Sequence, residues 1–287
     1  MEAGLLMFFS QKKYSKNCLF LYHCIFTNPP AMAFSDFRQF SHTYKHITHP
    51  VYHKGTGPPV LVMHELPGMV PECIAFAERL VAAGFSVYLP LLFGRPNKQA
   101  TAANLLRLCI SREFYLFAKH KTSPIVAWLR DLCSHLHTLH GPENKGVGAI
   151  GMCLTGGFAI PLLVEPSLMA PVLSQPSLPA NLSAAHKRAL GYSQEELQAA
   201  KARVEAENLR IKAFRFSADK LAPKARIQTL QQYFGPALGY HELPSDQQAP
   251  HGKGCHAVFT IDFVDEPAHP TSLALEELIA FFRQRLM

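Results

Sequence analysis

The run Gly148–Gly157 constrains the fold of this chain most. Its sequence, GAIGMCLTGG, starts as an apolar stretch typical of a buried strand and continues into a glycine-rich turn with Cys153 at its apex. The helix that follows must be short or kinked, because Pro161 lacks a backbone N–H. We expect a side chain at Gly151 or Gly157 to collide with the adjoining strand or helix. The run therefore predicts a strand–turn–helix unit that presents a thiol. The alternative is an inert, buried structural cysteine.

Two groups that can activate this thiol follow later in the chain. Asp219 comes just past the apolar run 211–214, and His269 lies in the loop before the last helix, expected over 271–286. The alternation in 257–263 predicts the strand that leads to the His269 loop. Strands alternate with helices from Pro58 onward, which predicts a mainly parallel central sheet with helices on both faces. All candidates then lie at the carboxyl edge of that sheet, where α/β proteins bind ligands.

The order of cysteine, aspartate and histidine along the chain is that of the α/β-hydrolase fold, which we predict. Asp262 and Asp265 remain alternatives to Asp219 as the partner of His269. His64 precedes the cysteine and gives the wrong order, and His256 is expected to lie in a strand. For these two histidines a structural role is the default.

Four motifs together resemble the dienelactone hydrolase family. They are VMHELPG at 62–68, GMCLTGG at 151–157, RFSADKLAP at 215–223 and DEPAHP at 265–270, and the resemblance covers about residues 58–287. The catalytic cysteine, aspartate and histidine of that family fall on Cys153, Asp219 and His269. A glutamate that contacts the thiol falls on Glu65. The resemblance implies hydrolysis of a small carboxylic ester or lactone through an acyl-enzyme, with no cofactor and no metal.

The chemistry expected of these groups is acyl transfer. His269 would accept the thiol proton, and Asp219 would fix the tautomer of the imidazole. The backbone N–H groups of Leu66 and Leu154 are the expected oxyanion-hole donors, because each comes directly after a site residue and beside a helix start.

The chain departs from the family pattern in two places. Thr155 stands where the family most commonly has glycine, and no arginine follows His269 to hold a substrate carboxylate. Arg95, Arg107 and Arg112, in an insertion expected over 94–122, could bind an anionic group, although solvated surface charge is the favoured interpretation. The physiological substrate therefore stays open. A non-catalytic or redox-responsive binding protein is the alternative function, supported by Thr155.

Composition sets the outer limits. A chain of 287 residues that is 48% hydrophobic can bury one large core, so we expect one domain over 40–287 behind a poorly ordered leader, 1–39. More than half of the net charge of +7 lies in residues 1–58, which hold six basic and two acidic residues. The rest of the chain has no stripe of basic and aromatic residues, so we do not expect it to bind nucleic acid. The leader's apolar runs are too short to span a bilayer. A membrane-associated leader and a start at Met32 remain alternatives.

The seven cysteines are scattered without a CxxC pair, which indicates reduced thiols and a cytoplasmic protein. The histidines at 42, 46, 49 and 53 are expected on the solvated face of an edge strand rather than around a metal. The expected partner is a small ester or lactone, not nucleic acid or membrane, and the expected state is a monomer or small homo-oligomer.

Overall fold

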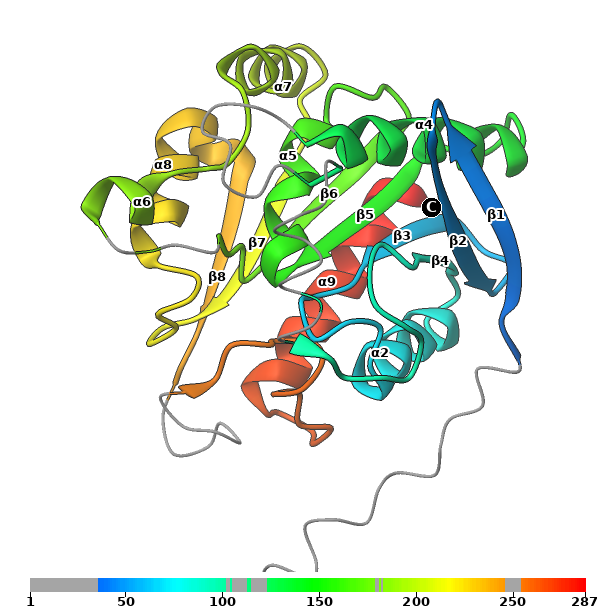
Figure 1. Ribbon diagram of the computed structural model, residues 1–287. Helices are drawn as coiled ribbons and strands as arrows, with labels where there is room; N and C mark the ends of the chain where they lie inside the picture. The colour runs from blue at the N-terminus through cyan, green and yellow to red at the C-terminus, as the bar shows by residue number, and fades with distance from the viewer. Residues whose placement is uncertain are drawn as a thin grey trace, which may run out of the picture. The chain divides into compact units, whose positions relative to one another are not determined.

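A twisted eight-stranded sheet forms the centre of the described part of the chain (Figure 1). The computed structural model describes residues 36–101, 104, 113–114, 123–178, 181, 183–245 and 254–287. The predicted leader up to residue 35, most of the 94–122 insertion and both Arg107 and Arg112 lie outside these residues. The predicted α/β-hydrolase architecture, a mostly parallel sheet covered by helices, is confirmed.

The strands follow one another in the sheet in the order β1-β2-β4-β3-β5-β6-β7-β8. β1 and β2 form an antiparallel hairpin, β2 is antiparallel to β4, and the remaining pairs are parallel. Their bounds are β1 Arg38–Tyr44, β2 Ile47–Lys54, β3 Pro59–Met63, β4 Ser86–Pro90, β5 Val147–Met152, β6 Leu168–Ser174, β7 Ile211–Phe216 and β8 Leu238–Leu243.

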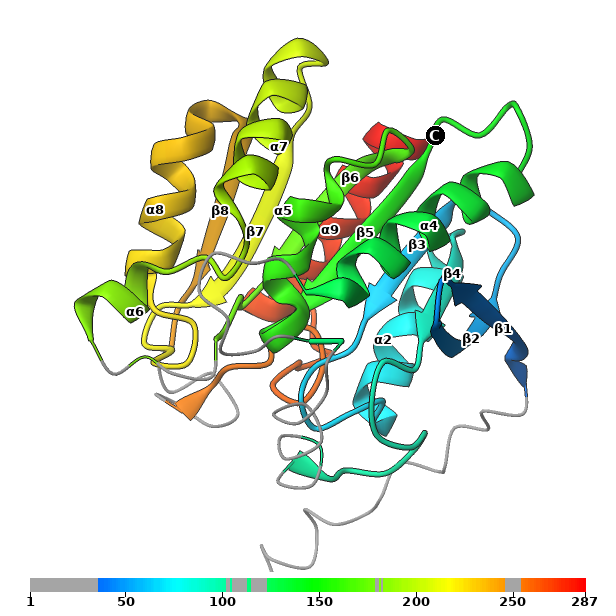
Figure 2. The same ribbon diagram turned by 45° about the horizontal axis from the view of Figure 1, so that its top comes forward.

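Helices cover both faces of this sheet (Figure 2). The helices α2 (Pro71–Ala82) and α9 (Pro270–Leu286) pack on one face. The other face carries α4 (Pro124–Leu139), α5 (Ala159–Leu162), α7 (Gln194–Ala206) and α8 (Lys224–Phe234). The short elements η2 (Cys153–Phe158), α6 (Ala184–Arg188) and η3 (Gly235–Ala237) complete the described helical structure.

Alternation along the central strands divides the core into two clusters. In β3, Leu61 and Met63 pack with α4, whereas Val60 and Val62 pack with α2 and α9, and all four are fully buried. Successive side chains of a strand point to opposite faces of the sheet, so a strand that is covered on both faces contributes to both clusters. This burial fixes the register of the strands and hence the positions at which they end.

The predicted strand at 257–263 is wrong. Residues 258–262 form turns, and the last described strand is β8, which the sequence analysis missed. Val258 and Phe259 are fully buried, and the Phe259 ring lies 5.4 Å from that of Phe76 and 5.1 Å from that of Phe214. The apolar residues of this segment thus anchor a loop in the core rather than pair in the sheet.

The N-terminal hairpin is an edge of the sheet, as expected, but two of its histidines are not solvated. His42 is 8% exposed, and its Nε2 lies 2.9 Å from Asp131 Oδ2 on α4. His49 bonds Glu113, and the Trp128 ring packs edge-on against both imidazoles. These histidines attach the hairpin to α4. Among the described residues, no group of three His, Cys, Asp or Glu side chains is placed to hold a metal ion.

Candidate active site

Cys153 lies at a strained turn directly after β5. Its φ is +54°, a left-handed conformation that is uncommon for a residue with a side chain. A Cβ on Gly151 would lie 2.1 Å from the carbonyl oxygen of Thr155, and one on Gly156 would lie 2.8 Å from that of Ser174. The expectation for Gly157 is wrong, since a Cβ there would meet nothing closer than 3.6 Å. Gly151 and Gly156 are therefore the glycines that permit this turn.

Asp219 is a buried carboxylate in the loop after β7. Its Oδ1 accepts hydrogen bonds from the backbone N–H groups of Leu221 at 2.8 Å and Ala222 at 3.1 Å. Its Oδ2 accepts a hydrogen bond from Nδ1 of His256 at 2.7 Å. The loop thus holds the carboxylate in one orientation and directs one oxygen at an imidazole.

His256 stands between this carboxylate and the thiol. Because Nδ1 is committed to Asp219, Nε2 is the nitrogen left for Cys153, and Nε2 makes no hydrogen bond to a described residue. Burial lowers the pKa of His256, but the hydrogen bond to Asp219 and the electrostatic influence of Cys153 and Asp219 outweigh that cost and hold the pKa well above its usual value. A charged imidazole beside a sulfur is the arrangement that stabilises a thiolate.

The prediction that His269 pairs with Asp219 is wrong. His269 is the N-cap residue of α9, where its Nδ1 accepts a hydrogen bond from the backbone N–H of Thr271 at 3.2 Å. Pro270 follows it at the first helical position, which is a favoured site for proline. The DEPAHP motif therefore begins a helix, and the histidine that meets Asp219 lies 13 residues earlier in the sequence.

Asp262 has a different role from the one weighed in the sequence analysis. One of its oxygens, Oδ2, accepts hydrogen bonds from the backbone N–H groups of His256 at 2.7 Å and Ala257 at 2.8 Å. It clamps the main chain that carries the imidazole and leaves the ring to Asp219. Asp265, the other alternative, is exposed and pairs with Arg79 on α2.

Glu65 follows β3 and is 1% exposed. Its Oε1 accepts a hydrogen bond from the Thr260 hydroxyl and its Oε2 one from Gln175 at 3.5 Å, so the expected contact with the thiol is replaced by these two donors. Burial raises the pKa of Glu65, and the nearby Asp262 adds to this, whereas Thr260, His256 and Gln175 oppose it. A carboxyl group that readily holds a proton thus lies in the same pocket wall as Cys153.

Thr155 occupies the position at which the chain departs from the family pattern. Its hydroxyl accepts a hydrogen bond from the backbone N–H of Met152 at 3.0 Å and lies 2.9 Å from the carbonyl oxygen of Met63, to which it donates. This hydroxyl thus joins the turn after β5 to the end of β3, and the whole side chain is buried. Threonine is therefore an integral part of the turn.

His64 is structural, as the default interpretation expected. Its Nδ1 donates to the Glu65 carbonyl oxygen at 3.1 Å, and its Nε2 accepts from the backbone N–H of Leu92 at 3.1 Å. Burial lowers the pKa of His64 to about 4. A neutral imidazole therefore connects the chain after β3 to the chain after β4.

A pocket of about 290 Å³ opens onto the thiol. Cys153, His256 and Glu65 line it, and so does Leu66, one of the two predicted oxyanion-hole residues. Leu154, the other, is buried in the first turn after the cysteine. Arg95 is exposed and does not line the pocket. Four neighbouring strands thus each end just before one polar residue of this region: Glu65 after β3, Cys153 after β5, Gln175 after β6 and Asp219 after β7.

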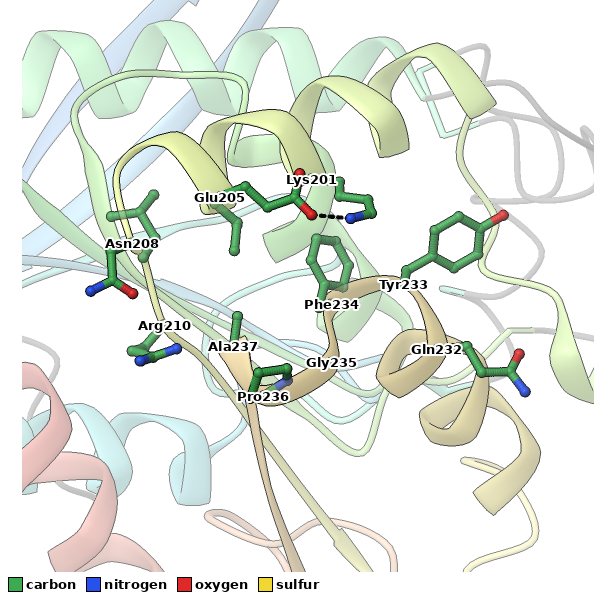
Figure 3. A pocket seen from close by; sticks show the side chains of 12 residues that line it. Lys201, Glu205, Asn208, Arg210, Gln232, Tyr233, Phe234, Gly235, Pro236 and Ala237 are labelled. Atoms are coloured by element: carbon green, nitrogen blue, oxygen red, sulfur yellow. Dashed lines mark hydrogen bonds and ion pairs between the residues drawn. The ribbon is translucent and has the colours of Figure 1, made fainter.

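A second pocket, of about 400 Å³, lies between the ends of α7 and α8 (Figure 3). Lys201 and Glu205 in its wall are paired with each other, and none of the predicted catalytic residues lines it. It opens where β7 and β8 begin, whereas Cys153 and Asp219 follow the ends of their strands. The two pockets therefore lie at opposite edges of the sheet.

The sheet, the strained turn and the acid–histidine pair together define an α/β hydrolase. The model of the dienelactone hydrolase family matches residues 47–251, and the chain belongs to this family.

Solved structures agree with this fold. A dienelactone hydrolase from Anabaena variabilis is 14% identical, with a TM-score of 0.56, and the match covers 88% of this chain and 100% of that one. A cold-adapted esterase from an Arctic intertidal metagenomic library is 15% identical, with a TM-score of 0.58 and coverages of 88% and 94%. Est1E from Butyrivibrio proteoclasticus is 12% identical, with a TM-score of 0.54 and coverages of 86% and 98%. A comparison with curated proteins found no match.

In the described part of the chain, no helix has both the length and the apolar character needed to cross a bilayer. The described cysteines, Cys73, Cys133, Cys153 and Cys255, are buried, and no disulfide joins any two of them.

Proposed function

We propose that this protein hydrolyses a carboxylic ester or lactone with Cys153 as nucleophile, His256 as general acid and base, and Asp219 as the residue that orients His256. The observation that carries the proposal is the 2.7 Å bond between Asp219 and His256 in the pocket that also holds the strained Cys153. Family membership supports the reaction class, as do the esterases among the structures of similar fold.

The first half of the reaction forms an acyl-enzyme. The sulfur of Cys153 attacks the substrate carbonyl carbon while His256 holds the proton on Nε2. The backbone N–H groups of Leu154 and Leu66 donate to the oxyanion that forms. Collapse of this intermediate breaks the ester C–O bond, and the proton on His256 passes to the departing alcohol oxygen.

The second half releases the acid. His256 removes a proton from water, the resulting hydroxide attacks the thioester carbon, and the sulfur leaves as thiolate. Asp219 stabilises the imidazolium in both halves, and its two backbone hydrogen bonds keep it from turning away.

Glu65 would tune the charge of the resting site. A charged carboxylate in the pocket wall disfavours a second negative charge on sulfur, whereas a protonated one does not. Glu65→Gln should therefore raise the rate of Cys153 alkylation by iodoacetamide. The measurement is made at pH 8, because Glu65 in the unmodified protein is ionised more often there than at lower pH. Equal rates in the two proteins would remove Glu65 from this role.

The decisive experiment compares two histidines. His256→Gln should reduce kcat for p-nitrophenyl acetate by about 10²- to 10⁴-fold, which is the usual contribution of a general base. His269→Gln should leave kcat roughly unchanged, because that side chain caps α9. If His269→Gln abolishes turnover and His256→Gln does not, the assignment of the base is wrong.

Intact-mass analysis tests the nucleophile. Rapid quenching of the unmodified enzyme should reveal an acyl adduct on Cys153, and Cys153→Ala should show neither adduct nor turnover. Turnover that survives in Cys153→Ala would contradict the proposed function.

A further inference from the structure

Apolar side chains stand at the rim of the pocket beside Cys153. Among the described residues, six large hydrophobic side chains are exposed, and two of them, Leu221 at 58% and Ile261 at 36%, line this pocket. Leu221 comes from the Asp219 loop and Ile261 from the His256 loop. Exposed apolar side chains gathered at one opening are typical of a binding site for an apolar ligand. Leu66, Pro67 and Ala257 extend this apolar surface inward.

The described lining of the pocket offers an anionic substrate no unpaired cation. None of these residues is lysine or arginine, and the one basic side chain among them, His256, is paired with Asp219. Two acidic residues, Glu65 and Asp262, line the same wall. A substrate carboxylate would lose its water there and gain no unpaired cation among these residues in return.

The two buried arginines of this region are already engaged. Arg226 donates to the carbonyl oxygens of Pro176, His186 and Ala189 and to the side chain of Asn181. Arg215 pairs with Glu242 and donates to the carbonyl oxygens of Ser217, Asp219 and Ala222. Both guanidinium groups hold loops in place, so neither is free to bind a carboxylate.

We infer that the substrate of this site is an uncharged ester with apolar groups around the scissile bond, and that the site rejects esters that carry a free carboxylate. The inference rests on the proposed function. The pocket has room for about ten water-sized groups, at roughly 30 Å³ each, which sets the size of the bound portion.

Two matched pairs of substrates test this inference on the full-length enzyme. In the first pair the acyl group carries the charge: mono-p-nitrophenyl glutarate against its methyl ester. In the second pair the alcohol carries it: 4-(carboxymethyl)phenyl butyrate against its methyl ester. We expect at least a tenfold higher kcat/KM for the methyl ester in one pair or both. A preference in one pair alone identifies the side of the ester that occupies the pocket.

Variants locate the effect. Leu221→Lys and Ile261→Lys should each reduce the preference for the methyl ester at least threefold, because each places a cation at the rim. Leu273→Lys is the matched control, since Leu273 is 46% exposed on α9 and does not line the pocket; its preference should match that of the unmodified enzyme.

Equal kcat/KM values for acid and methyl ester in both pairs would overturn the inference and leave the proposed function intact. Failure to hydrolyse any of the four esters, with no acyl adduct on Cys153, would overturn the proposed function itself.

Discussion

Substitutions of Thr155 test how much a single hydroxyl stabilises the turn at Cys153. Thr155→Val keeps the shape but leaves the buried N–H of Met152 without its acceptor. An unsatisfied buried donor costs about 1–3 kcal/mol, so the free energy of unfolding should fall by that amount. Thr155→Ser keeps the hydroxyl and should lose clearly less in the same urea titration. Equal losses in the two variants would mean that the methyl group contributes as much to stability as the hydroxyl does, and would contradict this expectation.

His256 should make stability depend on pH. Its pKa is raised above the usual 6.5, so the folded protein holds the proton more tightly than the unfolded chain. The resulting stabilisation is complete below pH 6.5 and is lost as the pH rises through the folded-state pKa. The unfolding free energy of the unmodified protein minus that of His256→Gln should therefore be larger at pH 6 than at pH 9. A difference that grows with pH would contradict the raised pKa.

At the scale of the element, β5 and η2 meet through glycine. Gly151→Ala should destabilise the protein by about 1–3 kcal/mol or more, because its methyl group would clash with the Thr155 backbone. Gly157→Ala, in η2, should stay within about 0.5 kcal/mol of the unmodified protein. Chemical denaturation of both variants measures the contrast. Equal losses would show that helix–sheet packing tolerates no side chain at either position.

The connection between β3 and β4 through His64 should fail in acid. The pKa of His64 is about 4 in the folded protein and near 6.5 when unfolded, so the unfolded chain binds a proton that the folded one does not. This stabilisation is complete above pH 6.5 and is lost as the pH falls towards 4, by about 3 kcal/mol in all.

The unfolding free energy measured between pH 7 and pH 4.5 should therefore fall less steeply in His64→Gln than in the unmodified protein. His46→Gln, which changes an exposed histidine, is the control and should show the unmodified slope. A slope unaltered by His64→Gln would contradict the assignment.

Elements with strong periodicity were predictable, and the irregular ones were not. The run into Cys153 and the strand before Asp219 were found because both are apolar and end at polar or small residues. β8, Leu238–Leu243, was missed because four of its six residues are only partly buried and include His241 and Glu242. The buried loop at 257–263 has the alternation of a strand, and a strand there places the histidine that follows it, His269, at the sheet edge in place of His256. The proline after His269 was the local signal for a helix cap.

At the scale of the whole molecule, one continuous sheet joins the N-terminal hairpin to the strands that carry the candidate active site. Trp128, the chain's one tryptophan, is fully buried beneath that hairpin and donates its indole N–H to the His42 carbonyl oxygen. Its fluorescence therefore reports on hairpin and α4, whereas far-UV circular dichroism reports on all elements. The two signals should give coincident unfolding curves in urea if the sheet unfolds as one unit. An earlier fluorescence transition would show that the hairpin separates first.

The overall architecture could be predicted because it follows from local patterns and from rules of chain connection. The pairing of His256 with Asp219 could not, because it depends on how a loop of irregular backbone folds back over the sheet. Asp262 fixes that loop by accepting hydrogen bonds from two backbone N–H groups, and no residue pattern in the sequence predicts these hydrogen bonds.

Glu65, Cys153, Gln175 and Asp219 each stand just beyond a different strand of one sheet. The loops behind these strands can consequently change one at a time during evolution, altering an acid, a donor or a rim residue while the others keep their places. New substrate preferences can arise on such an edge without a new fold.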